Sequence, residues 1–211
     1  YLIQSHISIV LLTLGFIWVY TSTGSFDFTA ITDYCISGGK EAGLLLFLVF
    51  FIGFAIKAGF VPFHTWLPHA HPAAPSHVSG LMSGVIIKTG IYGILRMLLL
   101  MPDNHLALGY LLLFVAVITS VYGVLLATVQ HNIKRLLAYH SIENIGIIGI
   151  GIGIGTIGSG LGNSFLAFAG YAGALLHTLN HSLFKSLLFY GAGTVYQATH
   201  TLFIDRMGGL I

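Results

Sequence analysis

Long apolar segments follow one another along almost the whole chain, and they constrain its fold more than any other feature. Each is close to the roughly 20 residues that a helix needs to cross about 30 Å of hydrocarbon. Lipid offers no partner for backbone N–H and C=O groups, so only helices or closed β-barrels span it, and the alternation of barrel strands is absent. We therefore predict an all-α fold, a polytopic membrane helix bundle with about six transmembrane helices. The predicted spans are residues 2–20, 41–61, 76–101, 106–130, 136–157 and 164–196.

The composition supports this class and excludes others. Hydrophobic residues make up 56% of the chain, only 7% are charged, and the mean hydropathy is +0.92. Soluble domains carry about 25% charged residues, so a soluble fold is excluded. A net charge of +2 gives no basis for binding nucleic acid. The single cysteine, Cys35, excludes a disulfide framework and an iron–sulfur cluster held by four thiolates of this chain, and no motif predicts a cofactor or metal centre.

No linker or soluble segment divides the chain. We expect one transmembrane domain, residues 1–211, that is a fragment of a longer polypeptide. A polar stretch, residues 21–40, should connect the first two spans. Lys134 and Arg135 should lie on the side that holds the connection between the second and third spans, with Lys40 on the opposite side. The positive-inside rule then assigns the Lys134 side to the cytoplasm.

Three lysines, Lys57, Lys88 and Lys185, lie inside segments that otherwise resemble lipid-embedded helices. A charged side chain at the centre of a bilayer costs about 2.5–3.5 kcal/mol by insertion measurements. Such residues usually face the bundle interior or a water-filled cavity. We interpret the three lysines as marks of a polar track through the membrane.

The strongest local pattern is HTLNHSLFKS in the last span. Its His177, His181 and Lys185 are four residues apart, which puts them along one stripe of a helix. Histidine changes charge near neutral pH, and a file of such groups linked by water can pass a proton in small steps. The alternative is a pair of histidines that face another helix while Lys185 reaches for the interface. A zinc site is less favoured because no third ligand is signalled.

Lys57 lies in FAIKAGFVPFHTWLP, where Pro62 and Pro68 must break or kink the helix because proline removes a backbone hydrogen bond. Broken backbone at membrane depth is tolerated only beside protein or a water-filled cavity. A charge next to such a break is typical of transporter sites. We favour a broken helix near Lys57–Pro62, and the alternative is a helix that ends at Pro62 with Lys57 snorkelling to the surface.

Lys88 stands near the middle of the third span, among small residues that let neighbouring helices approach. A structural ion pair with a carboxylate outside this sequence would bury it equally well. Glu143, beside His140 and Asn144, is the one carboxylate well inside a predicted span. A role in proton uptake and a simple cap interaction fit its position equally, about two turns into the helix.

Histidines crowd the connection FHTWLPHAHPAAPSH. Its prolines predict an irregular loop at the membrane interface, where side chains such as those of Trp66 and the histidines are common. A role in proton uptake or coupling is the second interpretation, and a metal cluster is the least favoured. The histidines are His64, His69, His71 and His77.

A run of glycines between Gly146 and Gly162 invites comparison with phosphate-binding loops. It alternates with isoleucine, lies in or beside a span and lacks the lysine of such loops, so we reject that interpretation. Close helix packing or a thin, mobile helix end explains the run better.

One long segment resembles the signature region of the antiporter-like proton-translocating membrane subunits, namely AIKAGFVPFHTWLPHAHPAAPSHVSGLMSGVIIKTGIYGILR. Such subunits occur in respiratory complex I, in multisubunit sodium/proton antiporters and in membrane-bound hydrogenases. Two more segments are most similar to the branch of hydrogenase-4 component B and the formate hydrogenlyase membrane subunit, HNIKRLLAYHSIENIGII and LLHTLNHSLFKSLLFYGAGTVY. The resemblance covers about residues 44–209.

The resemblance implies a larger bundle of about fourteen helices that contains two inverted repeats. The predicted spans would match about the sixth to eleventh of these helices. Lys57 would be the lysine of the first broken helix, and Lys88 the connecting lysine of the next helix. Lys185, with His177 and His181, would belong to the central axis of the second half.

Other positions follow the same resemblance. The motif loop after the first break would contain His64, Pro68 and His71. Glu143 fits the hydrogenase branch better than the complex I branch, whereas His69 stands where complex I relatives usually have aspartate. By the same resemblance, the family's partner glutamate and its second broken helix lie outside this sequence.

The function that the resemblance implies is a proton-translocating membrane subunit of a hydrogenase or formate hydrogenlyase-type complex, or of an NADH-dehydrogenase-like one. It implies other membrane subunits and a soluble redox module as partners, a lipid bilayer, and the plasma (inner) membrane of a prokaryote. A sodium/proton antiporter subunit is the first alternative, and a membrane scaffold that moves nothing is the second. The expected proton path contains Lys57, Lys88, Glu143, His177, His181 and Lys185.

Overall fold

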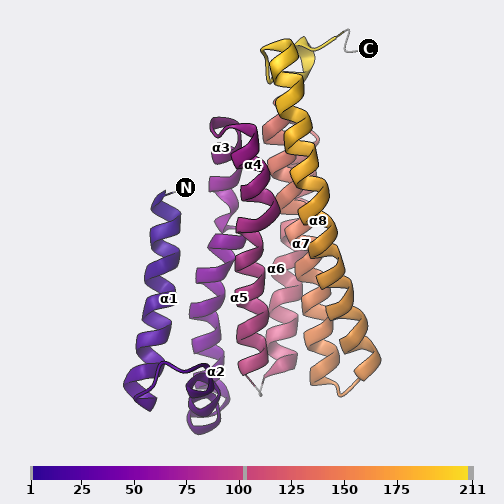
Figure 1. Cartoon of the computed structure of the whole chain (residues 1–211). Coiled ribbons are helices and arrows are strands. Elements are labelled where there is room, and N and C mark those ends of the chain that lie inside the picture. Colours follow the sequence, from indigo (N-terminus) through magenta and orange to yellow (C-terminus); the bar gives the residue numbers. More distant parts are fainter. Residues whose placement is uncertain (1, 102–103, 209–211) are drawn as a thin grey trace.

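The structure, a computed structural model, describes residues 2–101 and 104–208, and these form helices joined by short connections (Figure 1). The all-α prediction is therefore confirmed. The α-helices are α1 (Leu2–Thr23), α2 (Phe28–Ala58), α3 (Trp66–Ala73), α4 (Ser76–Leu81), α5 (Ile87–Leu100), α6 (His105–Ala127), α7 (Ile133–Gly160) and α8 (Ser164–Thr199). Two 3₁₀ turns, Phe63–Thr65 and Ile204–Arg206, and a π-helical turn, Met82–Ile86, complete the described elements.

The long helices run side by side as one bundle. α1 lies at one edge beside α2, and α5 joins α2 to a second group formed by α6, α7 and α8 (Figure 1). The largest helix–helix interfaces are those of α6 with α7 and of α7 with α8. α8 also packs along α4 and the π-helical turn. α5, which carries Lys88, thus packs on α2, and the π-helical turn directly before it packs on α8.

Five segments of the described chain are long and apolar enough to cross a membrane. They are Leu2–Thr23, Phe28–Ala73, Ser76–Leu100, His105–Ala127 and Ile133–Gly160. The sixth predicted span corresponds to α8, which is 36 residues long but is not among these five. Polar side chains in the middle of α8, from His177 to Ser186, lower its hydropathy. This explains why five spans are found where about six were predicted.

The predicted broken helix is present between α2 and α3. α2 ends at Ala58, and Gly59 adopts a left-handed conformation with φ of 88°. The peptide between Val61 and Pro62 is cis, and helical structure resumes at Phe63. Other helices satisfy the interrupted backbone, since the Val61 N–H donates to Thr119 Oγ1 on α6 at 3.1 Å. The break therefore lies against protein, which is where non-helical backbone inside a membrane is tolerated.

The connection after the break is helical, and the prediction of an irregular interfacial loop is wrong. Pro68 lies in the first turn of α3, where a missing N–H removes no intrahelical hydrogen bond. Pro72 lies close to the end of the same short helix. The histidines are not all interfacial either, since His64 and His71 are buried.

The polar stretch predicted between the first two spans is also largely helical. α2 already begins at Phe28, and its axis is kinked at Gly39, whose φ of 76° and ψ of −178° are not helical. The polar residues before Gly39 therefore form a first helical section rather than a connection. Glycine permits that conformation because it lacks a Cβ atom.

The glycine run belongs to α7 and forms its contacts with α6 and α8. A Cβ at Gly146 would lie 2.4 Å from the backbone nitrogen of Ser120, and one at Gly158 would lie 2.4 Å from that of Ala167. Such distances are far below van der Waals contact, so the helix backbones touch at these positions. The prediction of close helix packing is confirmed.

The two ends of the bundle carry the charges as predicted. Lys134 Nζ donates to the Ala74 carbonyl at 2.8 Å, and Asn132 forms a β-bridge with Phe203, so these three connections meet at one end. At the other end, Asn104 Nδ2 donates to the carbonyl of Lys40 at 2.6 Å. Which end faces the cytoplasm stays a prediction.

Candidate functional site

A π-helical turn places Lys88 in the bundle. The turn, Met82–Ile86, interrupts the regular helix between α4 and α5. The Lys88 ammonium donates to the carbonyl of Ser83, five residues earlier, within this widened turn. On the side of α8, the Ser182 hydroxyl donates to the Gly84 carbonyl at 2.5 Å, where the absent side chain allows close approach. π-turns of this kind are frequent at functional sites.

Lys88 contacts the polar stripe of α8 at His181. Its Nζ lies 2.6 Å from His181 Nδ1, and the imidazole is fully buried. His181 Nε2 is also buried and has no hydrogen-bond partner among the described residues. The ring of His177 lies nearly parallel to that of His181, with centroids 6.3 Å apart. Two of the three stripe residues thus continue from Lys88 along α8.

His177 links the stripe to α7. Its Nε2 lies 2.9 Å from the Asn144 side-chain oxygen, so the nitrogen is the donor in this contact. Asn144 Nδ2 donates to the His140 carbonyl at 2.6 Å. The His140 imidazole in turn pairs with the Glu143 carboxylate at 2.5 Å. Glu143 therefore forms an ion pair within α7 if His140 is protonated, rather than a helix cap.

Lys185, the third stripe residue, reaches α7 by another contact. Its side chain is 1% exposed, and its Nζ donates to the Leu137 carbonyl at 2.9 Å. The same carbonyl accepts from the Ser141 hydroxyl at 2.9 Å, and Ser141 Oγ lies 2.9 Å from Ser83 Oγ. Since the Ser83 carbonyl accepts from Lys88, both lysines border one pair of serine hydroxyls.

Neither of these lysines forms a salt bridge with a carboxylate in the part of the chain that the structure describes. The polar atoms that Lys88 and Lys185 contact are carbonyl oxygens and an imidazole nitrogen. A buried charge without a countercharge is costly. Within the described residues the two lysines are therefore held by uncharged acceptors.

Lys57 lies apart from this cluster. It is the penultimate residue of α2, directly before the break, and its side chain is half-buried. It makes no hydrogen bond or ion pair with a described residue, and it lines a small cavity with Ser5 and Trp66. The structure therefore does not join Lys57 directly to Lys88.

The residues of the predicted motif loop occupy two places. His64 is buried with its ring edge-on to Tyr122 of α6, at a centroid distance of 4.8 Å. His71 is fully buried and stacks on Phe189 of α8 at 4.5 Å, and neither of its ring nitrogens has a partner among the described residues. Pro68 is buried in α3. Phe189 follows Lys185 by one helical turn, so His71 lies at the end of the lysine cluster.

Sequence reasoning did not single out Ser141 or the Leu137 carbonyl, and it did not predict the π-helical turn. A polar side chain in an apolar span was the only available signal for Ser141. The described residues contain no group of three or more His, Cys, Asp or Glu side chains placed to hold a metal ion.

Comparison with known proteins places this arrangement in a family. Residues 1–211 match the family described as NADH:quinone oxidoreductase/Mrp antiporter, TM. Hydrogenase-4 component B of Escherichia coli is 43% identical over 213 residues, which cover 100% of this chain and 31% of that protein. Formate hydrogenlyase subunit 3 of Escherichia coli is 46% identical over 165 residues, which cover 78% of this chain and 27% of that protein.

NADH-quinone oxidoreductase subunit M of Rickettsia bellii is 36% identical over 202 residues, or 95% of this chain and 39% of that protein. The chain thus spans about a third of the length of these curated relatives.

Solved structures of related membrane complexes contain chains with the same fold. The archaeal membrane-bound sulfane sulfur reductase, a respiratory membrane complex, contains a chain that superposes with a TM-score of 0.86 at 26% identity. That match covers 100% of this chain and 41% of the other. The Mrp complex from Dietzia sp. DQ12-45-1b gives a TM-score of 0.76 at 25% identity, with 92% of this chain and 34% of the other covered. Together with the family match over its whole length, these comparisons show that the chain belongs to the NADH:quinone oxidoreductase/Mrp antiporter membrane family.

Proposed function

We propose that this chain is part of a proton-translocating subunit in the plasma (inner) membrane of a prokaryote. The observation that carries the proposal is the contact between Lys88 Nζ and the buried His181 imidazole, 2.6 Å apart, between two different helices. Lysine and histidine can each gain or lose a proton, and a direct contact lets one proton be shared between them. The names of the bacterial relatives, hydrogenase-4 component B and formate hydrogenlyase subunit 3, support the same function.

The proposed path has two branches at Lys88. One passes through His181 and His177 toward the Asn144–Glu143 region of α7, with water completing the steps that lack a direct contact. The other passes by the serine hydroxyls toward Lys185. Neither lysine pairs with a described carboxylate, so two protonated lysines here would repel each other.

Lys57 and the buried histidines are proposed to supply this cluster. Lys57 sits at the break, where interrupted helices commonly border water-filled cavities in transporters. A change in its ion pairing, with a partner outside this chain, would alter the field at Lys88. His64 and His71 are proposed to act in proton uptake or coupling.

The energy for transport is proposed to come from partner proteins. No redox centre is encoded in this sequence, and the relatives carry the names of hydrogenase, formate hydrogenlyase and NADH-quinone oxidoreductase components. We therefore propose other membrane subunits and a soluble redox module of the hydrogenase type as partners. The chain itself would contribute ion transport and not the redox reaction.

A sodium/proton antiporter subunit is the second candidate. The likeness to the Mrp complex, with a TM-score of 0.76, supports it as a family relation. This alternative needs no redox module, and it predicts that transport depends on sodium.

The test compares Lys88→Met with Lys40→Met in the complete assembly, reconstituted in proteoliposomes with a pH-sensitive dye. Methionine keeps the length of the side chain and removes the charge. We predict at least about a tenfold loss of proton transport for Lys88→Met, and little change for Lys40→Met, which alters an exposed lysine at the end of the bundle.

The outcome also separates the candidates. Wild-type transport by Lys88→Met would contradict the proposal and favour a scaffold. Proton movement that requires sodium and continues without a redox substrate would favour the antiporter.

A further inference from the structure

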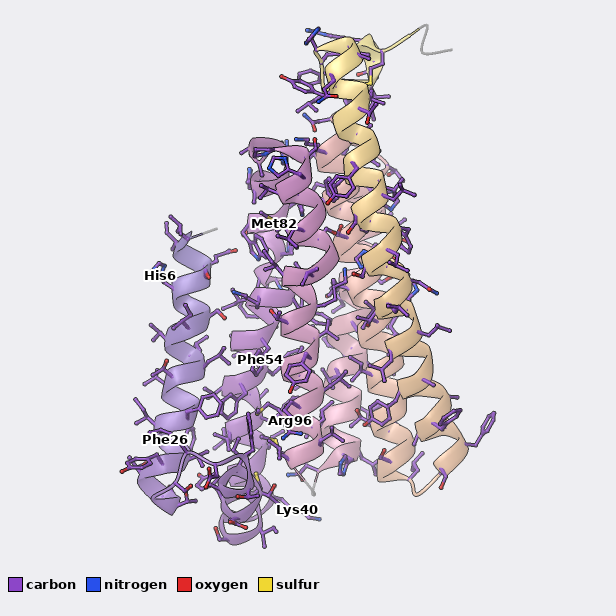
Figure 2. All side chains as sticks on the ribbon, viewed as in Figure 1. His6, Phe26, Lys40, Phe54, Met82 and Arg96 are labelled. Atoms are coloured by element: carbon purple, nitrogen blue, oxygen red, sulfur yellow. The ribbon has the colours of Figure 1, made fainter. Side chains whose placement is uncertain are left out.

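Asn144 and His177 face each other across the interface between α7 and α8. The two helices pack side by side, and their side chains meet along the contact (Figure 2). The helices are held together on both sides of this pair. The Leu137 carbonyl of α7 accepts from a lysine of α8 at 2.9 Å, and a Cβ at Gly151 would lie 3.0 Å from a side chain of α8. Leu137 and Gly151 lie about two turns before and after Asn144, so packing holds Asn144 opposite His177.

The orientation of the Asn144 amide follows from its two contacts. Its Nδ2 donates to the His140 carbonyl at 2.6 Å. A carbonyl oxygen only accepts, so only the NH₂ group of the amide can face it. The amide oxygen is thereby turned toward His177, whose Nε2 lies 2.9 Å away. Because an amide oxygen also only accepts, the Nε2 of His177 must carry a hydrogen.

This contact constrains both protonation states of His177. A neutral imidazole has a hydrogen on one ring nitrogen and a lone pair on the other, and the cation has a hydrogen on both. Since Nε2 donates to the amide in each state, the two states differ only by the hydrogen on Nδ1. The amide itself is not among the side chains that titrate, so it offers no place to which the Nε2 proton can pass.

We propose that Asn144 is a positioning residue that keeps a hydrogen on Nε2 of His177 and leaves Nδ1 as the nitrogen that exchanges a proton. A proton that reaches His177 then leaves from Nδ1 through water, and it does not cross Asn144 toward the Glu143–His140 pair. The part of Asn144 in transport rests on the function proposed above. The assignment of the hydrogen concerns one imidazole and is measured without transport.

Other titratable groups near His177 influence how readily its ring becomes charged. Among the described residues, however, Asn144 is the one hydrogen-bond partner of the ring, so it selects the nitrogen. The other groups are His181 on α8, Lys88 on α5, and His140 and Glu143 on α7.

The test is an NMR titration of the full-length protein in lipid bilayers with isotopically labelled histidine. A protonated and a bare ring nitrogen differ widely in chemical shift, and Cδ2, which is bonded only to Nε2, tells the two nitrogens apart. The signals of His177 are those that His177→Phe removes. Between about pH 5 and 8, where histidine changes charge, we expect Nε2 to remain an N–H and any change to fall on Nδ1. In the neutral ring, the form with hydrogen on Nε2 should exceed the other form roughly tenfold.

Variants of Asn144 test whether the amide causes this preference. Asn144→Leu removes the acceptor and should lower the ratio about fivefold, the typical net effect of one hydrogen bond. Asn144→Asp keeps an oxygen acceptor and should keep the hydrogen on Nε2. Asn180→Leu is the matched control, because Asn180 is exposed on α8 and forms no side-chain hydrogen bond with a described residue, and it should leave the ratio unchanged.

Three results would overturn the proposal. They are a largely bare Nε2 in the unaltered protein, an unchanged ratio in Asn144→Leu, and a fall in Asn180→Leu as large as that in Asn144→Leu. The first needs no variant, so the proposal does not rest on the folding of an altered chain. Wild-type transport by Lys88→Met would contradict the proposed function and leave the assignment at His177 standing, so the two failures are distinguished.

Discussion

Two lysines, the buried Lys185 and the half-buried Lys88, border one small polar cluster in which their described partners are uncharged acceptors or a histidine. Lys88 contacts Ser83 and His181, and Lys185 contacts the Leu137 carbonyl. In a purely structural role, a buried lysine would be expected to face a carboxylate. No described carboxylate pairs with Lys88 or Lys185.

Ser141 connects the two lysines, and its removal should weaken the fold. The hydroxyl is buried and bonds both Ser83 and Leu137. Ser141→Ala leaves the Ser83 hydroxyl without this partner, so we predict a loss of about 1–3 kcal/mol in the free energy of unfolding. Ser159→Ala, at an exposed serine with a single hydrogen bond, should change it by less than about 0.5 kcal/mol. Denaturant unfolding in detergent micelles measures both, and equal effects would contradict the assigned role.

At this scale the sequence predicted which residues carry the chemistry better than it predicted their partners. The spacing of His177, His181 and Lys185 places them on one stripe, and the structure contains that stripe. The partners on α7, Asn144 and Ser141, depend on how α7 is rotated about its axis. That rotation is set by contacts between helices and cannot be derived from the spacing within one of them.

At the scale of elements, two interruptions of regular helix flank the site. The break at Gly59 lies beside Lys57, and the π-helical turn Met82–Ile86 lies just before Lys88. α5 comes very close to α2 here, since a Cβ at Gly90 would lie 2.7 Å from the backbone nitrogen of Ala58. Close packing against a neighbouring helix therefore holds the end of α2 next to the break.

Gly59→Ala tests the break. Gly59 and Gly24 both have positive φ, 88° and 74°, so alanine should cost about 1–2 kcal/mol of backbone strain at either position. A Cβ at Gly59 would also lie 2.2 Å from Leu67, whereas nothing lies within 4 Å at Gly24. We predict that Gly59→Ala costs about 1–3 kcal/mol more than Gly24→Ala, as measured by thermal unfolding. Equal costs would show that Leu67 adjusts freely.

Gly146→Ala tests the contact of α7 with α6. A Cβ there would collide with the backbone of Ser120, which cannot move independently of its helix. We predict a destabilisation of about 1–3 kcal/mol. Gly173→Ala in α8 is the matched control, because nothing lies within 4 Å and alanine favours a helix by about 1 kcal/mol. If both variants are equally stable, the glycine run does not determine this interface.

The existence of the helices could be read from apolar length, but several of their limits could not. Residues 28–38 are polar enough to suggest a connection, yet they form the first section of α2 before the kink at Gly39. α3 forms despite Pro68 and Pro72 because both lie near its ends. The polar side chains of α8 lower its apolar character, although its buried face packs against α7 and α4.

At the scale of the whole molecule, the described bundle resembles about a third of its curated relatives. Its lysine cluster draws on α5, α7 and α8, so the proposed path crosses between helices instead of following one. Lys57, on α2, is not joined to that cluster by any described contact. Water or another protein segment must therefore bridge this step if Lys57 takes part.

The central claim is that Lys88 and His181 form one step of a single proton path, and a double-mutant cycle tests it most directly. Protons moved per redox turnover are measured in the complete assembly for Lys88→Met, His181→Phe and the double variant. The account predicts that each single variant loses most of the transport and that the double variant is no worse than the more severe single one. Wild-type transport in either single variant, or losses that multiply in the double variant, would contradict it.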